Sequence, residues 1–114
     1  MISMDICLAI LDKISHPIVF VNNDHVIKYL NKLAQKRYYE QRGYSDLIGK
    51  SLFDCHNSIS KNKIIAIHQQ LREGTDEVCI GVFKNEKITV VGVRDPKGEL
   101  IGYFERFEKS DQAK

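Results

Sequence analysis

The sequence predicts an α+β domain: a five-stranded antiparallel sheet with helices packed on one face, and an additional N-terminal helix. Three observations predict this class. A strand hairpin pattern comes first, helical patterns occupy the centre of the chain, and three strand patterns joined by tight turns close it. With 114 residues, the chain is long enough for one hydrophobic core and too short for a second.

The N-terminal segment predicts a short helix, followed by a single domain and a tail. Apolar residues recur at helical spacing over residues 3–14 and make an unusually wide apolar face. We expect one side of this helix to cover the sheet of its own domain and the other to meet a second subunit. The alternative is that it packs wholly on its own domain. The expected organisation is a helix over residues 1–15, the domain over 16–108 and a charged tail over 109–114.

A hairpin and a second helix are predicted next. Pro17 ends the first helix, because the residue before a proline is restricted to extended geometry. Strands are predicted over residues 18–21 and 26–30, and the Asn-Asn-Asp run between them tolerates left-handed turn conformations. The helical pattern over residues 31–42 stops at Gly43, a residue type favoured just past helix ends.

The longest helix is predicted in the middle of the chain. Ser51 is suited to cap a single helical turn, and Asn57, Ser58 or Ser60 is suited to cap the long helix, which runs to about Arg72.

Three strands then follow, over residues 78–83, 87–94 and 99–107. The first tight turn between them is predicted at residues 85–86 and the second at residues 95–98.

Composition excludes several classes of protein. Hydrophobic residues make up 43% and charged residues 28%, as in ordinary soluble domains, and no run approaches the ~20 apolar residues that span a bilayer. The N-terminal segment has acidic residues within its apolar stretch and no basic leader, so we expect a cytoplasmic protein. The net charge is +2 and the basic residues are spread along the chain, which disfavours a nucleic-acid partner.

No enzyme motif is found. Cys55 and His56 are adjacent, but successive helical residues diverge by about 100°, so the imidazole does not reach the thiol as a catalytic base would. A zinc site needs four ligands, and no second Cys/His pair lies close in sequence. A long-range set stays open, made of His16, His25, Cys55 and His56.

Several segments match one family. The run PIVFV at residues 17–21 matches its first strand, Asn31 stands where its members commonly have an asparagine, and LIGKSL at residues 47–52 matches the entry to its central helices. Residues 94–102 match the turn between its last two strands. Together these segments resemble a PAS domain. The Asp-Cys-His step before Asn57 also resembles a PAS subgroup that reads DCHP, with asparagine in place of proline.

The PAS resemblance implies a bacterial-type sensory or regulatory domain that is not an enzyme. Such a domain binds a small ligand or a partner, and signals through a homodimer formed by the N-terminal helix and the sheet face. One alternative is a ligand-free dimerisation module with a filled core. A second is a gas or redox sensor containing b-type haem. The flavin-binding photosensory class is set aside because its Asn-Cys-Arg-Phe run is absent.

The resemblance also places a cavity between the long helix and the sheet. Helical periodicity and strand alternation then select its walls. If haem binds, His68 is the candidate iron ligand, although the family position falls near Ile64. The other interpretation of His68 is a partly exposed residue, and that of His56 is a ring that bonds loop carbonyls. The expected ligand-binding residues are His56, Cys55, Ile64, Ile67, His68, Leu71, Arg72, Ile80, Val91 and Phe104.

Overall fold

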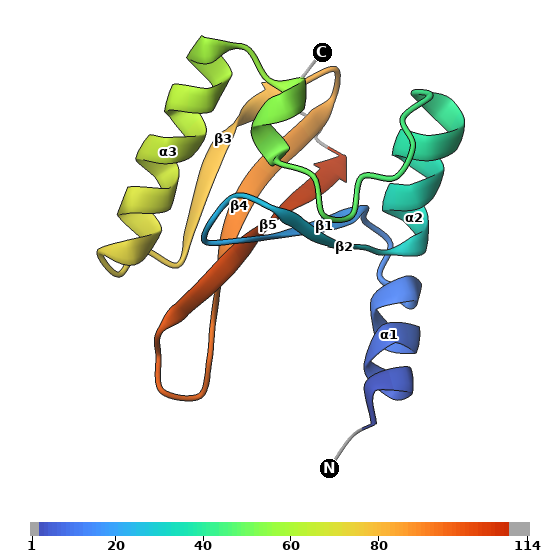
Figure 1. The fold of residues 1–114 in the computed structure, drawn as a ribbon, viewed down its shortest axis with the longest axis horizontal. Helices are drawn as coiled ribbons and strands as arrows, with labels where there is room; N and C mark the ends of the chain where they lie inside the picture. The colour runs from blue at the N-terminus through green and yellow to red at the C-terminus, as the bar shows by residue number, and fades with distance from the viewer. Residues whose placement is uncertain (1–2, 110–114) are drawn as a thin grey trace.

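A computed structural model describes residues 3–109, and the side chain of Cys55 lies outside that description. Its centre is a five-stranded antiparallel sheet in the order β2-β1-β5-β4-β3 (Figure 1). This confirms the predicted α+β class. The strands are β1 (Ile18–Asn22), β2 (Ile27–Leu30), β3 (Glu77–Phe83), β4 (Glu86–Arg94) and β5 (Leu100–Lys109).

The helices begin at the predicted caps. Ser51 Oγ accepts a hydrogen bond from the N–H of Phe53 at 3.2 Å, and Asn57 Oδ1 accepts one from the N–H of Ser60 at 2.8 Å. Each cap satisfies a backbone donor that has no partner within its helix. The helical elements are α1 (Met4–Lys13), α2 (Lys32–Gln35), the π-helical segment η1 (Lys36–Gln41), the 3-10 turn η2 (Leu52–Cys55) and α3 (Ser58–Arg72).

The helix predicted over residues 31–42 consists of two different structures. After the short α2, the N–H of Arg42 donates to the carbonyl of Arg37, five residues earlier, at 3.1 Å. The hydroxyl of Tyr39, within this wider turn, accepts a hydrogen bond from the N–H of Leu47 in the following loop at 3.3 Å. Hydrophobic periodicity does not distinguish a π turn from an α turn, so the sequence did not reveal this change.

The turn between β3 and β4 lies one residue earlier than predicted. Lys84 and Asn85 both have positive φ, 50° and 68°, as in the two-residue turns whose twist suits a hairpin. Glu86 is therefore the first residue of β4 and not part of the turn. The turn after β4 confirms the prediction, because Asp95 Oδ1 accepts hydrogen bonds from the N–H groups of Lys97 and Glu99 at 2.9 and 3.0 Å.

Asn31 joins the N-terminal helix to the rest of the domain. Its side chain is fully buried, with 0% exposure. Its Oδ1 accepts hydrogen bonds from the N–H groups of Ile18 and Ala34 at 2.9 and 3.0 Å. Its Nδ2 donates to the carbonyls of Leu11 and His16 at 3.1 and 3.0 Å. One amide therefore caps α2 and fixes the end of α1 to the start of β1, using all four of its hydrogen-bonding positions.

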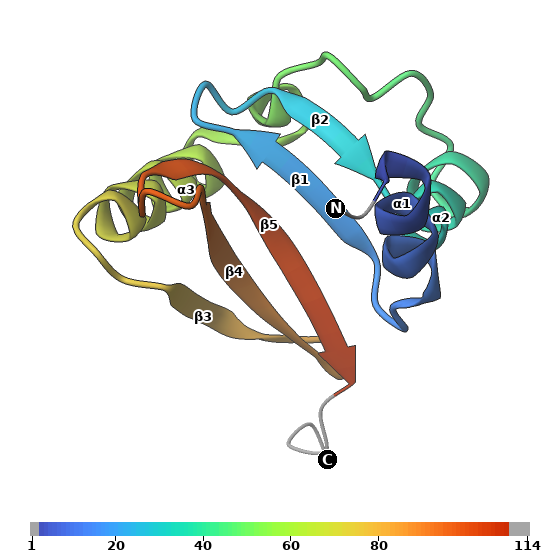
Figure 2. The ribbon, with the colours of Figure 1, turned by 90° about the horizontal axis from the view of Figure 1, so that it is seen from below.

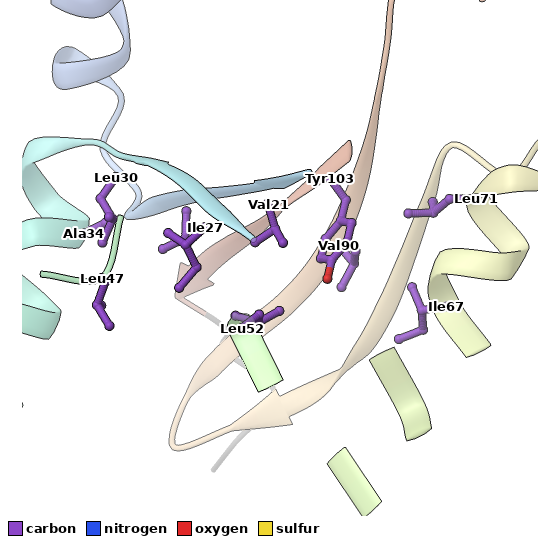
Figure 3. Packing of buried hydrophobic residues seen from close by; sticks show 11 residues of the cluster. Val21, Ile27, Leu30, Ala34, Leu47, Leu52, Ile67, Leu71, Val90 and Tyr103 are labelled. Carbon is purple, nitrogen blue, oxygen red and sulfur yellow. The ribbon is translucent and has the colours of Figure 1, made fainter. Parts of the chain in front are cut away.

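The buried core runs along the side of the sheet that faces the helices. Figure 3 shows its side chains at the α2 end, along the sheet and at the α3 end. Leu30, Ala34 and Leu47 lie at the α2 end, Val21, Val90 and Tyr103 lie along the sheet, and Ile67 and Leu71 lie at the α3 end.

The N-terminal helix α1 does not cover the sheet as expected. It projects away from the start of β1 and lies over neither sheet face (Figures 1 and 2). Four of its apolar residues are exposed by 37 to 77%: Met4, Ile6, Leu8 and Ile10.

Its last turn instead contacts the start of α2, where Asp12 Oδ1 accepts a hydrogen bond from the N–H of Lys32 at 2.9 Å. Within residues 3–109, no helix has the length and apolar character needed to cross a membrane. Most of the predicted tail, residues 110–114, lies outside the described residues.

Candidate ligand-binding cavity

A cavity of about 820 Å³ lies between α3, η1 and the helix-facing side of the sheet. This volume is in the range of small-molecule sites. Protein interiors are otherwise close-packed, with few voids larger than a water molecule. Its apolar wall is made of Val19, Val21, Ile27, Leu47, Leu52, Ile64, Ile67, Ile80, Val82, Ile88 and Val90.

The helical periodicity of the sequence identified the side of α3 that faces the cavity. Ile64, Ile67 and His68 of α3 all line the cavity. His68 is buried, with 7% exposure, and is not the partly exposed residue of the other interpretation. Ile80 of β3 and His56 line the cavity as well.

Four of the expected site residues lie elsewhere. Leu71 is fully buried but packs toward Gly92 of β4 and does not line the cavity. Arg72 is exposed and is also absent from the cavity wall. Val91 and Phe104 are absent from it too. The side chain of Cys55 lies outside the description, so its expected place at the cavity edge stays a prediction.

Val91 and Phe104 lie on the outer face because the inward rows are displaced by one residue from those predicted. Val91 pairs with Phe104 in the sheet, and Gly92 pairs with Tyr103, which lines the cavity. Since adjacent strand residues face opposite sides, an error of one residue reverses the whole row. The inward row of β4 was hard to recognise in the sequence because it includes Gly92. This glycine has no side chain, and a Cβ there would lie 3.3 Å from a methyl group of Leu71.

The inward row of β5 consists of Tyr103, Glu105 and Phe107, which all line the cavity. Sequence reasoning missed these residues. The available signal was a glutamate alternating with two aromatic residues in a strand at the centre of the sheet.

A polar network occupies the Tyr103 end of the cavity. The Tyr103 hydroxyl and His25 Nδ1 are 2.7 Å apart, and the His25 ring lies edge-on to His68 with centroids 4.8 Å apart. His68 Nε2 donates to Asn23 Oδ1 at 3.1 Å, since the Asn23 amide itself donates to the Leu100 carbonyl at 2.8 Å. Burial lowers the pKa of both histidines, so both rings favour the neutral form.

Glu105 lies in the middle of the cavity wall, between Val19 of β1 and Val90 of β4 in the sheet register. Burial raises the pKa of its carboxyl, and a charge on His56 opposes that rise to a smaller extent. Among the residues that the structure describes, none forms a hydrogen bond or ion pair with this carboxyl. Its accessible part faces the cavity.

Arg37 of η1 lies at the Phe107 end of the same row. Its guanidinium is 4.8 Å from the centroid of the Phe107 ring, and its Nη2 donates to Glu86 Oε2 at 2.6 Å. Its other terminal nitrogen, Nη1, is buried and has no hydrogen-bond partner in the described part of the chain.

Exposed basic residues complete this end of the cavity: Arg42, Lys63 and Lys84.

His56 forms the loop contact that its position predicted. Its Nδ1 donates to the carbonyl of Leu52 at 2.7 Å, which ties the turn η2 to the start of α3. Among the described side chains, no group of three or more His, Cys, Asp or Glu residues is arranged to hold a metal ion. The long-range set suggested by the sequence included Cys55, whose side chain lies outside the description.

The fold is similar to those of solved bacterial proteins. One is a C-terminal domain from Streptococcus mutans, with a TM-score of 0.78 and 23% identity over 95% of this chain and 85% of that one. Another is a PAS domain from Colwellia psychrerythraea, with a TM-score of 0.63 and 17% identity over 93% of this chain and 95% of that one. The chain has a PAS fold.

A further PAS neighbour is the Aer2 receptor from Vibrio cholerae, a dual PAS-heme oxygen sensor. Its TM-score is 0.57, with 20% identity over 83% of this chain and 94% of that one. No protein-family model matches the sequence. No curated protein matches it either. The similarity to the DCHP subgroup of PAS domains therefore stays a prediction.

Proposed function

We propose that this PAS domain is a non-catalytic sensory module that binds a small ligand in its cavity and signals through a dimer interface. The cavity of about 820 Å³ is the observation that carries this proposal, because its volume is in the range of small-molecule sites and it lies between the long helix and the sheet. Apolar walls with a few polar groups are typical of small-molecule sites. Solved neighbours with this fold include a sensor histidine kinase from Vibrio cholerae and the Aer2 receptor.

The ligand-free module with a filled core is less well supported. It required Ile64, Ile80 and Phe104 to meet across the space between helix and sheet. Ile64 and Ile80 both line the cavity, whereas Phe104 lies on the outer face of β5.

Haem binding is also less well supported, because the residues do not fit it in this arrangement. His68 Nε2, the nitrogen that would bind iron, is hydrogen-bonded to Asn23, and the His68 ring packs against His25. We expect purified protein to show no Soret absorption band.

Toluene is a suitable probe for the cavity itself. We expect it to shift the NMR methyl signals of Ile64 and Ile67, and the variant Val90→Phe, which fills the cavity from β4, to abolish those shifts. The control is Val91→Phe, the next residue on the outer face, which should leave toluene binding intact. Absence of any shift in the unmodified chain, or equal loss in both variants, would contradict a ligand cavity.

The proposed partner is a second copy, bound through α1 and the outer sheet face. Support comes from the exposed apolar residues of α1 and from Val91 and Phe104 on that sheet face. We expect the double variant Ile6→Glu and Ile10→Glu to sediment as a monomer. The control Lys13→Glu, on the same helix, should remain dimeric. A dimer that survives the double substitution would show that α1 is not the interface.

A further inference from the structure

Two polar groups of the cavity wall have no partner within the described protein. Arg37 Nη1 is a buried donor, and the carboxyl of Glu105 forms no hydrogen bond with a described residue. Leaving a buried polar group unpaired is destabilising, and folded proteins contain few of them. The other buried side-chain atom without a partner among the described residues, Thr89 Oγ1, belongs to a residue paired with Arg106 in the outward-facing row. The two cavity groups therefore stand out as a pair.

Both groups lie on the same stretch of wall. Glu105 and Phe107 are alternate residues of β5 and face the same side, so their Cα atoms are about 7 Å apart. The Arg37 guanidinium lies 4.8 Å from the centre of the Phe107 ring. A donor and a carboxyl thus border neighbouring parts of the cavity, within reach of one small molecule.

The surroundings of the pair favour an uncharged ligand. The charge of Arg37 is already balanced by Glu86 at 2.6 Å, so its free nitrogen requires an acceptor and not a counter-ion. The wall beside Glu105 is apolar, because its sheet neighbours are Val19 and Val90, and transferring a charged group against it is unfavourable. The basic residues Arg42, Lys63 and Lys84 at the Arg37 end are exposed, so solvent screens their charges. Burial raises the pKa of the Glu105 carboxyl, which indicates that the site disfavours charge.

We propose that Arg37 and Glu105 select uncharged small molecules that carry a hydrogen-bond acceptor and a donor close together, as a primary amide does. The acceptor of the ligand faces Arg37 Nη1 and its donor faces the Glu105 carboxyl. This inference rests on the proposed ligand-binding function and specifies the chemistry of the ligand.

Arg37 and Glu105 each allow a conservative substitution that separates recognition from folding. Arg37→Lys keeps one cation to pair with Glu86 but removes Nη1, the terminal nitrogen that has no partner in the described part of the chain. Glu105→Leu removes the carboxyl and keeps an apolar side chain in the wall. Glu105→Gln retains a carbonyl oxygen that accepts a hydrogen bond from the ligand.

The test is an NMR titration of the full chain with four probes that share one ring: benzamide, toluene, benzoate and benzylamine. We expect Arg37→Lys and Glu105→Leu each to weaken benzamide binding about tenfold, the effect of one lost hydrogen bond. Toluene binding should be unchanged in both variants, which also shows that the cavity is intact. Glu105→Gln should keep most of the benzamide affinity. Benzoate and benzylamine should bind more weakly than benzamide.

The outcomes separate this inference from the proposed function. Unaltered benzamide binding in Arg37→Lys and Glu105→Leu, with toluene still bound, would overturn recognition by the pair and leave the cavity as a ligand site. Tighter binding of benzoate than of benzamide would overturn the selection of uncharged ligands. Failure of all four probes to bind would overturn both proposals.

Discussion

Asn31 and Glu105 are both polar side chains inside the domain, yet their surroundings differ. Asn31 forms four hydrogen bonds to backbone groups of α1, the α1–β1 connection, β1 and α2. Glu105 has an apolar neighbour on each adjacent strand and no hydrogen-bond partner among the described residues. A polar group with all its partners stabilises the fold, whereas one without partners destabilises it. The difference indicates that Asn31 serves the structure and that Glu105 serves what enters the cavity.

The largest effect is expected at Asn31. The variant Asn31→Ala leaves two buried backbone N–H groups and the carbonyl of His16 without their partners, and should lower the free energy of unfolding by about 3–5 kcal/mol. The matched control is Asn57→Ala, which removes an exposed helix cap and should cost about 1 kcal/mol. Chemical denaturation measures both. Equal losses of unfolding free energy in the two variants would show that Asn31 contributes no more than an exposed helix cap.

Replacing Glu105 should raise the free energy of unfolding, whereas replacing Asn31 lowers it. Because burial raises its pKa above the usual 4.5, the folded state holds the proton more tightly than the unfolded state. Its stabilising contribution is thus present at low pH and lost as the pH rises through the raised pKa. At neutral pH, Glu105→Gln should therefore increase the free energy of unfolding by about 1 kcal/mol.

That gain should disappear in acid, where the wild-type carboxyl is protonated. The control is Glu108→Gln on the outer face of the same strand, where the pKa is lowered by the hydrogen bond from Arg106. It should give no gain at neutral pH. Loss of stability in Glu105→Gln would show that the carboxyl has a structural partner.

The smallest expected effect concerns His25 and His68. Burial lowers the pKa of both rings below the usual 6.5, so the unfolded chain takes up protons that the folded chain does not. Stability should be full above pH 6.5 and decline as the pH falls below it. His68→Gln keeps a donor for Asn23 and should reduce that decline, as measured by thermal unfolding from pH 7 to 5. If the melting temperature falls equally with pH in the unmodified chain and in His68→Gln, His68 does not contribute to the decline.

Much of the fold could be predicted from the sequence because its signals are local. Pro17 and the caps Ser51 and Asn57 mark where elements end and begin, and each acts through a neighbouring backbone group. The π turn of η1 and the place of α1 could not be predicted. The first has nearly the same periodicity as an α-helix, and the second depends on contacts with Asn31 that are distant in sequence.

The cavity was predicted in part, for a similar reason. Periodicity along α3 identifies its inward face, and Ile64, Ile67 and His68 of that face line the cavity. It does not show where along the helix the cavity ends, so Leu71 was included although it packs toward Gly92. On β4 and β5 both faces carry apolar residues, and alternation alone does not say which row faces inward. The pairing of Gly92 with Tyr103 settles that choice, and such pairing exists only in the folded sheet.

The most direct test of this account is to measure stability and ligand affinity together in the single variant Glu105→Leu. If Glu105 serves the ligand and not the fold, the variant should unfold at a higher temperature at neutral pH and bind benzamide about tenfold more weakly. Lower stability combined with unchanged benzamide binding would contradict the account, because Glu105 would then be a structural residue like Asn31.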